Sequence, residues 1–275
     1  MFADLTLARR IDRAEASLSA DIAAAILARG QVHGGFQRAF GAGVAVCAGP
    51  GSPVTKVIGV GFDGAVDGAA LDELEVEYFA SGSPVRAEVS TLADPAFARQ
   101  LTDRGYVLQG FENVLARPLA GTAAPLLPDG TAIGPPSAHD TFMNVLIDGF
   151  ASPDPGLVST LGESFPRHIL ERTFADMATA RGFVRYLATI DGVPASAASM
   201  RLCDGVAQLC GAATLPPFRR RGLQSALLQA RLHNAAAAAC DLAVVTTEPG
   251  SKSQQNAQRA GFALIYARAI LVKEP

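Results

Sequence analysis

The stretch that most constrains the fold is residues 209–228, LCGAATLPPFRRRGLQSALL, because it contains a strand, a break and the start of a helix. Residues 209–215 form a short apolar run that is typical of a buried strand. Pro216 and Pro217 end that strand, since neither residue has an N–H to donate to a neighbouring strand. From Leu223 onward, apolar residues recur at helical spacing. The sequence therefore predicts a strand and a helix joined by a short turn.

The turn itself is basic and contains a glycine. Three arginines precede Gly222, and the next residue opens the predicted helix. The first turn of a helix carries N–H groups without intrahelical partners and about half a positive charge. Arginine can bind two phosphate oxygens at once, and glycine lets a ligand approach the backbone closely. We therefore predict a pyrophosphate site here, with a solvated arginine cluster before a surface helix as the alternative.

The pattern Thr214-x-Pro216-x-x-Arg219-x-x-Gly222-x-Gln224 resembles the acyl-CoA-binding signature of the GNAT superfamily, the acyl-CoA-dependent N-acetyltransferases. The core of that signature is Gln/Arg-x-x-Gly-x-Gly/Ala. Arg219 and Gly222 match it, whereas Gln224 stands where Gly or Ala is usual. The context of strand, proline break, basic turn and helix strengthens the resemblance.

Length and composition describe a globular chain. Its 275 residues suit two domains of ordinary size, and 49% of them are hydrophobic and 18% charged. The 23 basic and 26 acidic residues give a net charge of −3, which is no basis for nucleic-acid or membrane-surface binding. The sequence shows neither an apolar run of membrane-spanning length nor the order of a signal peptide. We therefore expect a cytoplasmic protein, either a monomer or a homodimer.

The cysteines do not form a metal-binding pattern. The four are scattered and include no C-x-x-C pair, at Cys47, Cys203, Cys210 and Cys240. No histidine stands at ligand spacing from them. We expect no metal, and we interpret the thiols as small buried side chains in a reducing compartment.

Two parts of the chain repeat one another. Residues 90–108 contain Ser-Thr, a proline, a predicted helix and Arg-Gly-Tyr-x-Leu, and residues 246–264 contain Thr-Thr, a proline, a predicted helix and Ala-Gly-Phe-x-Leu. The pairs at the two ends share one offset, since Thr91 and Thr247, and likewise Gly105 and Gly261, are 156 residues apart. We therefore predict two related domains, over 1–120 and 138–275. A linker rich in Pro, Gly, Ala and Thr joins them over 121–137.

The first half lacks the basic turn. Residues 56–64, KVIGVGFDG, stand where the second half has its arginines, and they contain glycines but no arginine. The helix that follows is predicted to begin only near Asp67. We therefore expect the first domain to be a degenerate copy that no longer binds the ligand.

The resemblance also implies a fold. Over 140–275 the predicted order is two helices, three strands, the basic turn, a helix, a strand, a helix and a last strand. GNAT proteins have this order and fold as a twisted mixed sheet flanked by helices. We therefore expect an α/β fold of the mixed α+β kind, with two GNAT-like domains that each contain such a sheet.

In the resembling family, the fourth and fifth strands splay apart and pantetheine lies between them; here these strands are 206–214 and 242–247. Backbone groups of residues 213–215 would pair with the pantetheine amides, as an added strand does. Ser251 and Asn256 would reach the same arm, although Ser251 also suits a helix cap. The implied acyl-CoA site consists of Ala213, Thr214, Leu215, Arg219, Arg220, Arg221, Gly222, Leu223, Gln224, Ser225, Ala226, Ser251 and Asn256.

The catalytic residues are less well marked. The family often places a tyrosine, the acid for the leaving thiolate, four residues before the Gly-Phe pair, and this chain has Ala257 there. Glu248 follows the fifth predicted strand and is our candidate base, if burial raises its pKa. The alternative for Glu248 is a solvated loop carboxylate.

The sequence thus favours an N-acetyltransferase that uses acetyl-CoA as co-substrate. A primary amine of a small molecule or peptide would attack directly in a ternary complex. The alternative is a CoA-binding sensor or scaffold with weak or no activity. A site for another nucleotide is disfavoured, because the P-loop and G-x-G-x-x-G patterns are absent. The sequence does not name the acceptor amine.

Overall fold

The computed structural model describes residues 1–30, 32–152 and 166–275. Its α-helices are α1 (Leu5–Ala28), α2 (Gly68–Ala80), α3 (Pro95–Asp103), α4 (His139–Phe150), α5 (Arg167–Met177), α6 (Leu223–Ala237) and α7 (Lys252–Arg259). Its strands are β1 (Phe36–Phe40), β2 (Gly43–Cys47), β3 (Lys56–Ile58), β4 (Val85–Ser90), β5 (Val107–Pro118), β6 (Thr131–Gly134), β7 (Phe183–Ile190), β8 (Val193–Cys203), β9 (Val206–Thr214), β10 (Leu242–Thr247) and β11 (Ala263–Lys273).

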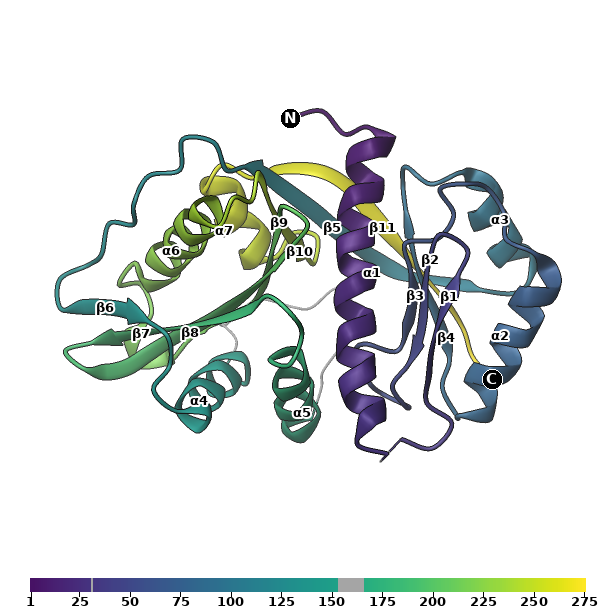
Figure 1. The fold of residues 1–275 in the computed structure, drawn as a ribbon, viewed down its shortest axis with the longest axis horizontal. Helices are drawn as coiled ribbons and strands as arrows, with labels where there is room; N and C mark the ends of the chain where they lie inside the picture. The colour runs from purple at the N-terminus through teal and green to yellow at the C-terminus, as the bar shows by residue number, and fades with distance from the viewer. Residues whose placement is uncertain (31, 153–165) are drawn as a thin grey trace.

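These strands form one continuous sheet in the order β1-β2-β3-β4-β11-β5-β10-β9-β8-β7-β6. The sheet is mixed, since β3 pairs with β4 and β10 with β9 in parallel, while the other pairs are antiparallel. Figure 1 shows the N-terminal half on one side of α1 and the C-terminal half on the other, with β5 and β11 crossing between them.

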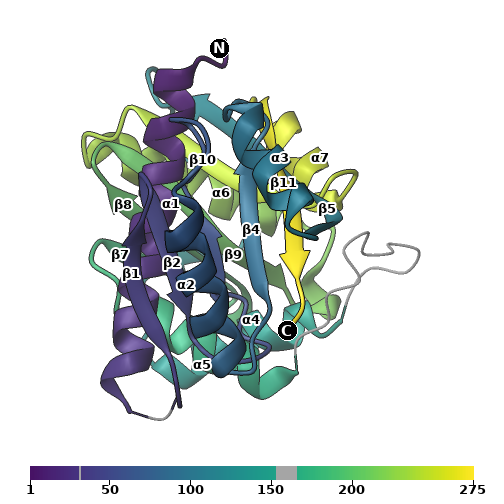
Figure 2. The ribbon, with the colours of Figure 1, turned by 90° about the vertical axis from the view of Figure 1, so that its right-hand side faces the viewer.

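The helices cover both faces of the sheet. On the first face, α1 packs against both halves: Ile22 of α1 lies in a core with Val46, and Ile11 in a core with Val244. Helices α4 and α5 continue this face over the C-terminal half (Figure 1). The second face carries α2 and α3 on the N-terminal half, in front of the sheet in Figure 2, and α6 and α7 on the C-terminal half.

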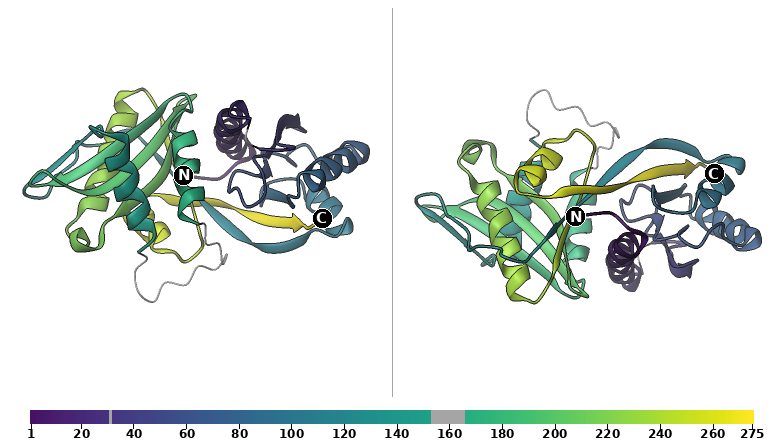
Figure 3. Two further views of the ribbon diagram at one scale, coloured as in Figure 1. Left: turned by 90° about the horizontal axis from the view of Figure 1, so that it is seen from below. Right: turned by 90° about the horizontal axis from the view of Figure 1, so that it is seen from above.

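The internal repeat predicted from the sequence is present in the structure. An offset of 156 residues carries β4 and α3 onto β10 and α7 to within a residue, and α2 and β5 onto α6 and β11 equally well. The two views of Figure 3 show that β5 and β11 run side by side from one half to the other.

The halves exchange their last strands, which the sequence did not predict. Strand β5 of the first half lies between β10 and β11, and β11 of the second half lies between β4 and β5. Glu112 of β5 pairs directly with Arg268 of β11, and these two residues are 156 positions apart. The approximate two-fold axis of the repeat therefore passes between Glu112 and Arg268. The two predicted sheets are consequently one.

Most predicted elements are confirmed, and two strands were missed. Strand β1 is short and alternates exposed and half-buried residues, a weak signal in the sequence. Strand β6 lies inside the predicted linker 121–137 and pairs with β7. Within the described residues, no helix is both long and apolar enough to cross a membrane.

Candidate functional site

The sheet opens between β9 and β10. The two strands pair only from Leu242 opposite Val206 to Val244 opposite Gln208. Beyond these pairs β9 continues to Thr214 and β10 to Thr247, while β10 stays paired with β5 along its other edge. The ends of β9 and β10 therefore diverge, as expected for the fourth and fifth strands of a GNAT domain.

A bulge at Gly211 bends β9 away from β10. The register between β8 and β9 slips there, because Ser199 pairs with Cys210 but its neighbour Ala198 pairs with Ala212. A β carbon at Gly211 would lie 2.7 Å from Cε1 of Phe174, so a larger residue here would displace the Phe174 ring. Extra residues of this kind bend a strand and disrupt its pairing locally.

A buried arginine donates hydrogen bonds to carbonyl groups at the bulge. Arg231 of α6 donates Nη1 to the carbonyl oxygens of Ser199 (3.0 Å) and Cys210 (3.4 Å). Burial lowers the pKa of Arg231 to about 10. The Cys210 carbonyl also accepts from Oγ of Ser199 (3.3 Å), so the carbonyls at the bulge have hydrogen-bond partners.

Backbone groups at the end of β9 face the opening. Leu215 donates its N–H to Ala195 of β8 (3.0 Å), so this N–H is not free, contrary to our expectation. Bonding alternates along an antiparallel ladder, so Ala213 also faces β8, while Thr214 and Ala212 face the opening. The carbonyl of Thr214 already accepts from Nε of Arg219 (3.1 Å). The N–H of Thr214 and the backbone of Ala212, which the sequence did not indicate, remain directed at the opening.

The turn between β9 and α6 adopts two left-handed conformations. Gly222 has φ 79°, and Arg220 has φ 61°. The glycine is therefore required for its backbone freedom. A β carbon there would point towards Pro128, 3.4 Å from its Cγ. A positive φ at the bulky residue Arg220 is uncommon, and such strained residues cluster at ligand sites.

The first turn of α6 has no side-chain cap. Gly222 is its N-cap, and the first intrahelical bond runs from Ala226 N–H to the Gly222 carbonyl. The N–H groups of Leu223, Gln224 and Ser225 precede that bond and have no intrahelical partner. Leu223 and Ala226 are buried in the core, so they hold the helix in place, whereas Gln224 and Ser225 are exposed.

The three arginines of the turn differ in their contacts. Arg219 donates to the carbonyls of Gly149 (3.3 Å) and Ser152 as well as to that of Thr214, so it ties the end of α4 to the end of β9. Arg220 and Arg221 are exposed, and the guanidinium of Arg221 lies 5.7 Å from the ring centre of Phe218. Arg219 therefore shapes the turn, while Arg220 and Arg221 supply exposed positive charge.

The remaining predicted residues lie around α7. Ser251 caps α7, accepting from the N–H of Gln254 (3.2 Å), which is the alternative considered for it. Asn256 donates to the side chain of Gln224 (3.2 Å) and so links α7 to the first turn of α6. Glu248 is half-buried, directly after β10.

Ala257 is buried in the core between α6 and α7, at 5% exposure. A tyrosine there would overpack this core, at a cost of about 1–3 kcal/mol. A polar group that the sequence did not indicate lies nearby: Thr247, the last residue of β10, is buried, and its Oγ1 has no hydrogen-bond partner. Buried hydroxyls normally have a partner, so Thr247 suits a ligand in the opening.

The equivalent region of the first half is bonded differently. Asp67 caps α2, accepting from the N–H of Ala70 (3.3 Å). The carbonyl of Gly61 accepts from the N–H of Asp94 (2.9 Å), which bridges the loop after β3 to the start of α3. A β carbon at Gly61 would lie 2.4 Å from the ring of Phe97. A cavity of about 510 Å³ remains beside this loop, and the residues that line it include Gly61, Gly64, Asp67 and Ala70.

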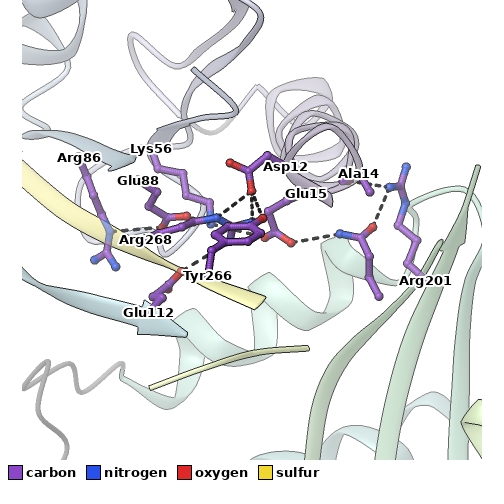
Figure 4. Close-up of polar contacts among 11 residues, drawn as sticks. Asp12, Ala14, Glu15, Lys56, Arg86, Glu88, Glu112, Arg201, Tyr266 and Arg268 are labelled. Atoms are coloured by element: carbon purple, nitrogen blue, oxygen red, sulfur yellow. Dashed lines mark hydrogen bonds and ion pairs between the residues drawn. The ribbon is translucent and has the colours of Figure 1, made fainter. Parts of the chain in front are cut away.

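A network of buried charges lies under α1 at the junction of the halves (Figure 4). Arg268 donates to Asp12 of α1 through Nε (3.1 Å) and Nη2 (2.6 Å). Lys56 lies 3.1 Å from Glu88 and 3.7 Å from Glu15. The described residues include no cluster of His, Cys, Asp and Glu that would hold a metal ion.

Comparisons with known proteins agree with this geometry. Residues 152–262 match the sequence model of the Acetyltransferase (GNAT) family. No curated protein matches the chain significantly.

Among solved structures, a GCN5-related N-acetyltransferase from Kribbella flavida is similar with a TM-score of 0.63 and 21% identity, over 94% of this chain and 95% of that one. A tandem GNAT protein from the clavulanic acid biosynthesis pathway is similar with a TM-score of 0.59 and 14% identity, over 86% of this chain and 81% of that one.

At these identities the structural likenesses show the fold. The sequence match lies on the half that contains the open strands and the basic turn. Residues 152–262 thus match the GNAT family in sequence, and the chain as a whole shares the fold of these GNAT structures.

Proposed function

We propose that the chain transfers an acetyl group from acetyl-CoA to a primary amine. The observation that carries the proposal is the open β9–β10 edge leading into the uncapped first turn of α6. An extended chain of amides fits an unpaired strand edge, and a pyrophosphate fits a helix start with free N–H groups. The two features follow one another along the chain, as pantetheine and pyrophosphate do in CoA.

Residues of the C-terminal half would hold the co-substrate. The N–H groups of Leu223, Gln224 and Ser225 would donate to the pyrophosphate, with Arg220 and Arg221 adding positive charge. Ala212 and Thr214 would pair with pantetheine amides. Thr247 Oγ1, a buried hydroxyl without a partner among the described residues, would donate to the thioester region at the end of β10.

We infer direct attack by the amine, without an acyl-enzyme. The thiol of Cys210 on β9 is a poor nucleophile, because burial raises its pKa to about 12. Burial also raises the pKa of Cys240. Acetyl transfer would therefore occur between two bound substrates, oriented by the enzyme.

Two measurements on the full chain test this proposal. Calorimetry should show CoA binding, and acetyl-CoA should release free thiol when supplied with members of a panel of primary amines, with the acetylated amine found by mass spectrometry. CoA binding without thiol release from any amine would favour the alternative, a CoA-binding sensor whose acid position is Ala257. Absence of CoA binding would contradict both readings.

A further inference from the structure

Glu112 lies at the open end of β10, although it belongs to the first half of the chain. The last pair between β10 and β5 is Thr247 with Asn113, so Glu112 is the next residue of β5 beyond that end. It stands on the strand that the halves exchange. A residue of the N-terminal half is thereby brought beside the opening between β9 and β10.

The side chain of Glu112 is directed to the face that carries α1. Residues two apart in a strand share a face, and Val114, two residues on, packs in the core formed with α1. Helix α6 packs on the opposite face. If the co-substrate enters from the side of α6, the amine approaches the thioester from the side of α1, where the Glu112 carboxylate lies.

Among the carboxylates of the buried network, Glu112 makes the weakest interactions with the other side chains. Its only ion pair among the described residues is with Arg268 Nη1, at 3.8 Å, and that nitrogen makes no hydrogen bond. The other two guanidinium nitrogens of Arg268, Nε and Nη2, donate to Asp12, so Arg268 lies between Asp12 and Glu112 (Figure 4). The Glu112 side chain is 19% exposed, against 2% for Asp12 and Glu88. The Glu112 carboxylate is therefore in contact with solvent, and its oxygens have lone pairs free to accept a hydrogen bond from a substrate.

The network contains more acidic than basic groups. Its ionisable side chains around Lys56 and Arg268 are the carboxylates Asp12, Glu15, Glu88 and Glu112, the cations Lys56, Arg86 and Arg268, and the phenol of Tyr266. Gln208 connects Glu15 to Arg201, which is paired with Asp21. With these two included, five carboxylates face four cations, so one bound proton balances the charges. Burial and the neighbouring Glu88 raise the pKa of Glu112 to about 7, against the opposing effects of Lys56 and Arg268. A carboxylate with this pKa is suited to accept a proton near neutral pH.

Resting on the proposed acetyl transfer, we propose that Glu112 is the general base that deprotonates the acceptor. Glu112 takes one proton from the ammonium group of the acceptor, leaving a neutral amine. The amine nitrogen then attacks the thioester carbonyl carbon, the C–N bond forms and the C–S bond breaks. The second proton lost by nitrogen passes through solvent to the departing sulfur, which gives the amide and the free thiol. The catalytic site is thus completed by the half that does not bind CoA.

The test compares Glu112→Gln with wild type in thiol release from acetyl-CoA, using two probe nucleophiles. Propylamine is protonated at neutral pH and needs the base, whereas hydroxylamine is largely unprotonated and does not. With propylamine, the variant should lose at least about tenfold in turnover at pH 7 and lose the acidic limb of the pH–rate profile. With hydroxylamine its loss should stay below about threefold, and calorimetry should show unchanged CoA affinity.

Two control variants sharpen the comparison. Glu248→Gln changes the other carboxylate near the end of β10 and should retain the acidic limb. Glu73→Gln neutralises an exposed carboxylate on α2 and should behave as wild type.

Glu112 is excluded as the base if Glu112→Gln binds CoA and keeps the wild-type profile, or if it loses equally with both nucleophiles. A tenfold loss confined to Glu248→Gln also overturns the assignment, as does a wild-type chain that binds CoA but releases no thiol with either nucleophile. Failure of the wild-type chain to bind CoA would instead contradict the proposed function itself.

Discussion

The two halves contain the same strand–turn–helix unit, but only in the second does the helix begin without a side-chain cap. In the second half, β9 and β10 diverge and α6 begins at Gly222 without a side-chain cap. In the first half, α2 begins at Asp67, whose carboxylate already accepts from the helix backbone. An acidic cap both occupies the N–H groups and repels a phosphate. A few local differences at the helix start therefore account for the phosphate site that we expect only in the second half, while the fold is the same.

The two halves also differ on the face of the sheet that carries α1. At the two-fold axis, Arg268 fills the face beside β4 and bonds Asp12, whereas its equivalent Glu112 lies beside the open end of β10. The first half thus contributes to the site indirectly. Its helix α1 packs against both halves, and its strand β5 contains the residue that we propose as base.

The largest effect should come from Gly222→Val, which we expect to abolish detectable CoA binding. Valine would not adopt the left-handed backbone at Gly222, so the turn and the first N–H groups of α6 would move. The matched control is Gly64→Val in the loop before α2, where φ is 97°. This control carries similar strain and should still bind CoA. Normal CoA affinity in Gly222→Val, measured by calorimetry, would place the pyrophosphate elsewhere.

Glu112→Gln should stabilise the protein above neutral pH, by about 1–3 kcal/mol in the free energy of unfolding. The folded chain holds the Glu112 proton up to about pH 7, whereas the unfolded chain loses it near pH 4.3. Stability of the wild type should therefore fall as pH rises from about 4.3 to about 7, and the variant should lack this part of the decline. Denaturant unfolding at pH 5 and pH 8 measures it, and an equal change at both pH values would contradict the raised pKa.

Arg221→Ala should weaken CoA binding by about 1–2 kcal/mol, since one charge-assisted contact among several is lost. Arg219→Ala provides the contrast, because Arg219 bonds carbonyls of the protein and its loss should also lower the melting temperature. Titration calorimetry and thermal unfolding of both variants separate the two roles. A stable Arg219→Ala and an unstable Arg221→Ala would reverse our assignment.

The smallest effect should come from Asp67→Ala in the first half. Loss of the helix cap should cost about 1 kcal/mol of stability without changing CoA affinity or creating a second site. The bridge from Asp94 to Gly61 still closes the loop in this variant. A second CoA site in Asp67→Ala would show that the cap alone keeps the first half closed.

Much of this comparison could be predicted from the sequence. The offset of 156 residues, the basic turn and the helix beginning near Asp67 are local signals, and the structure contains all three. The exchange of β5 and β11 could not be predicted, since strand order depends on pairing between residues far apart in the chain. For the same reason the sequence did not indicate Glu112. The sequence of β5 does not show that this strand lies beside β10.

Other site details depended on backbone geometry. The pattern of Leu215 and its neighbours predicted a strand end, but which N–H groups face the opening follows from the register with β8. The orphaned hydroxyl of Thr247 likewise emerges only when its surroundings are packed. Ser251 satisfied both a ligand and a capping interpretation, and only the distance to Gln254 shows the cap.

The most direct test of the central claim is the number of CoA sites per chain, measured by titration calorimetry on the full-length protein. We predict one site, lost in Gly222→Val and retained in Gly64→Val. Two equivalent sites per chain would contradict the expected loss of CoA binding in the first half, where Asp67 caps the helix, and no binding at all would contradict the assignment of the open β9–β10 edge as the acyl-CoA site.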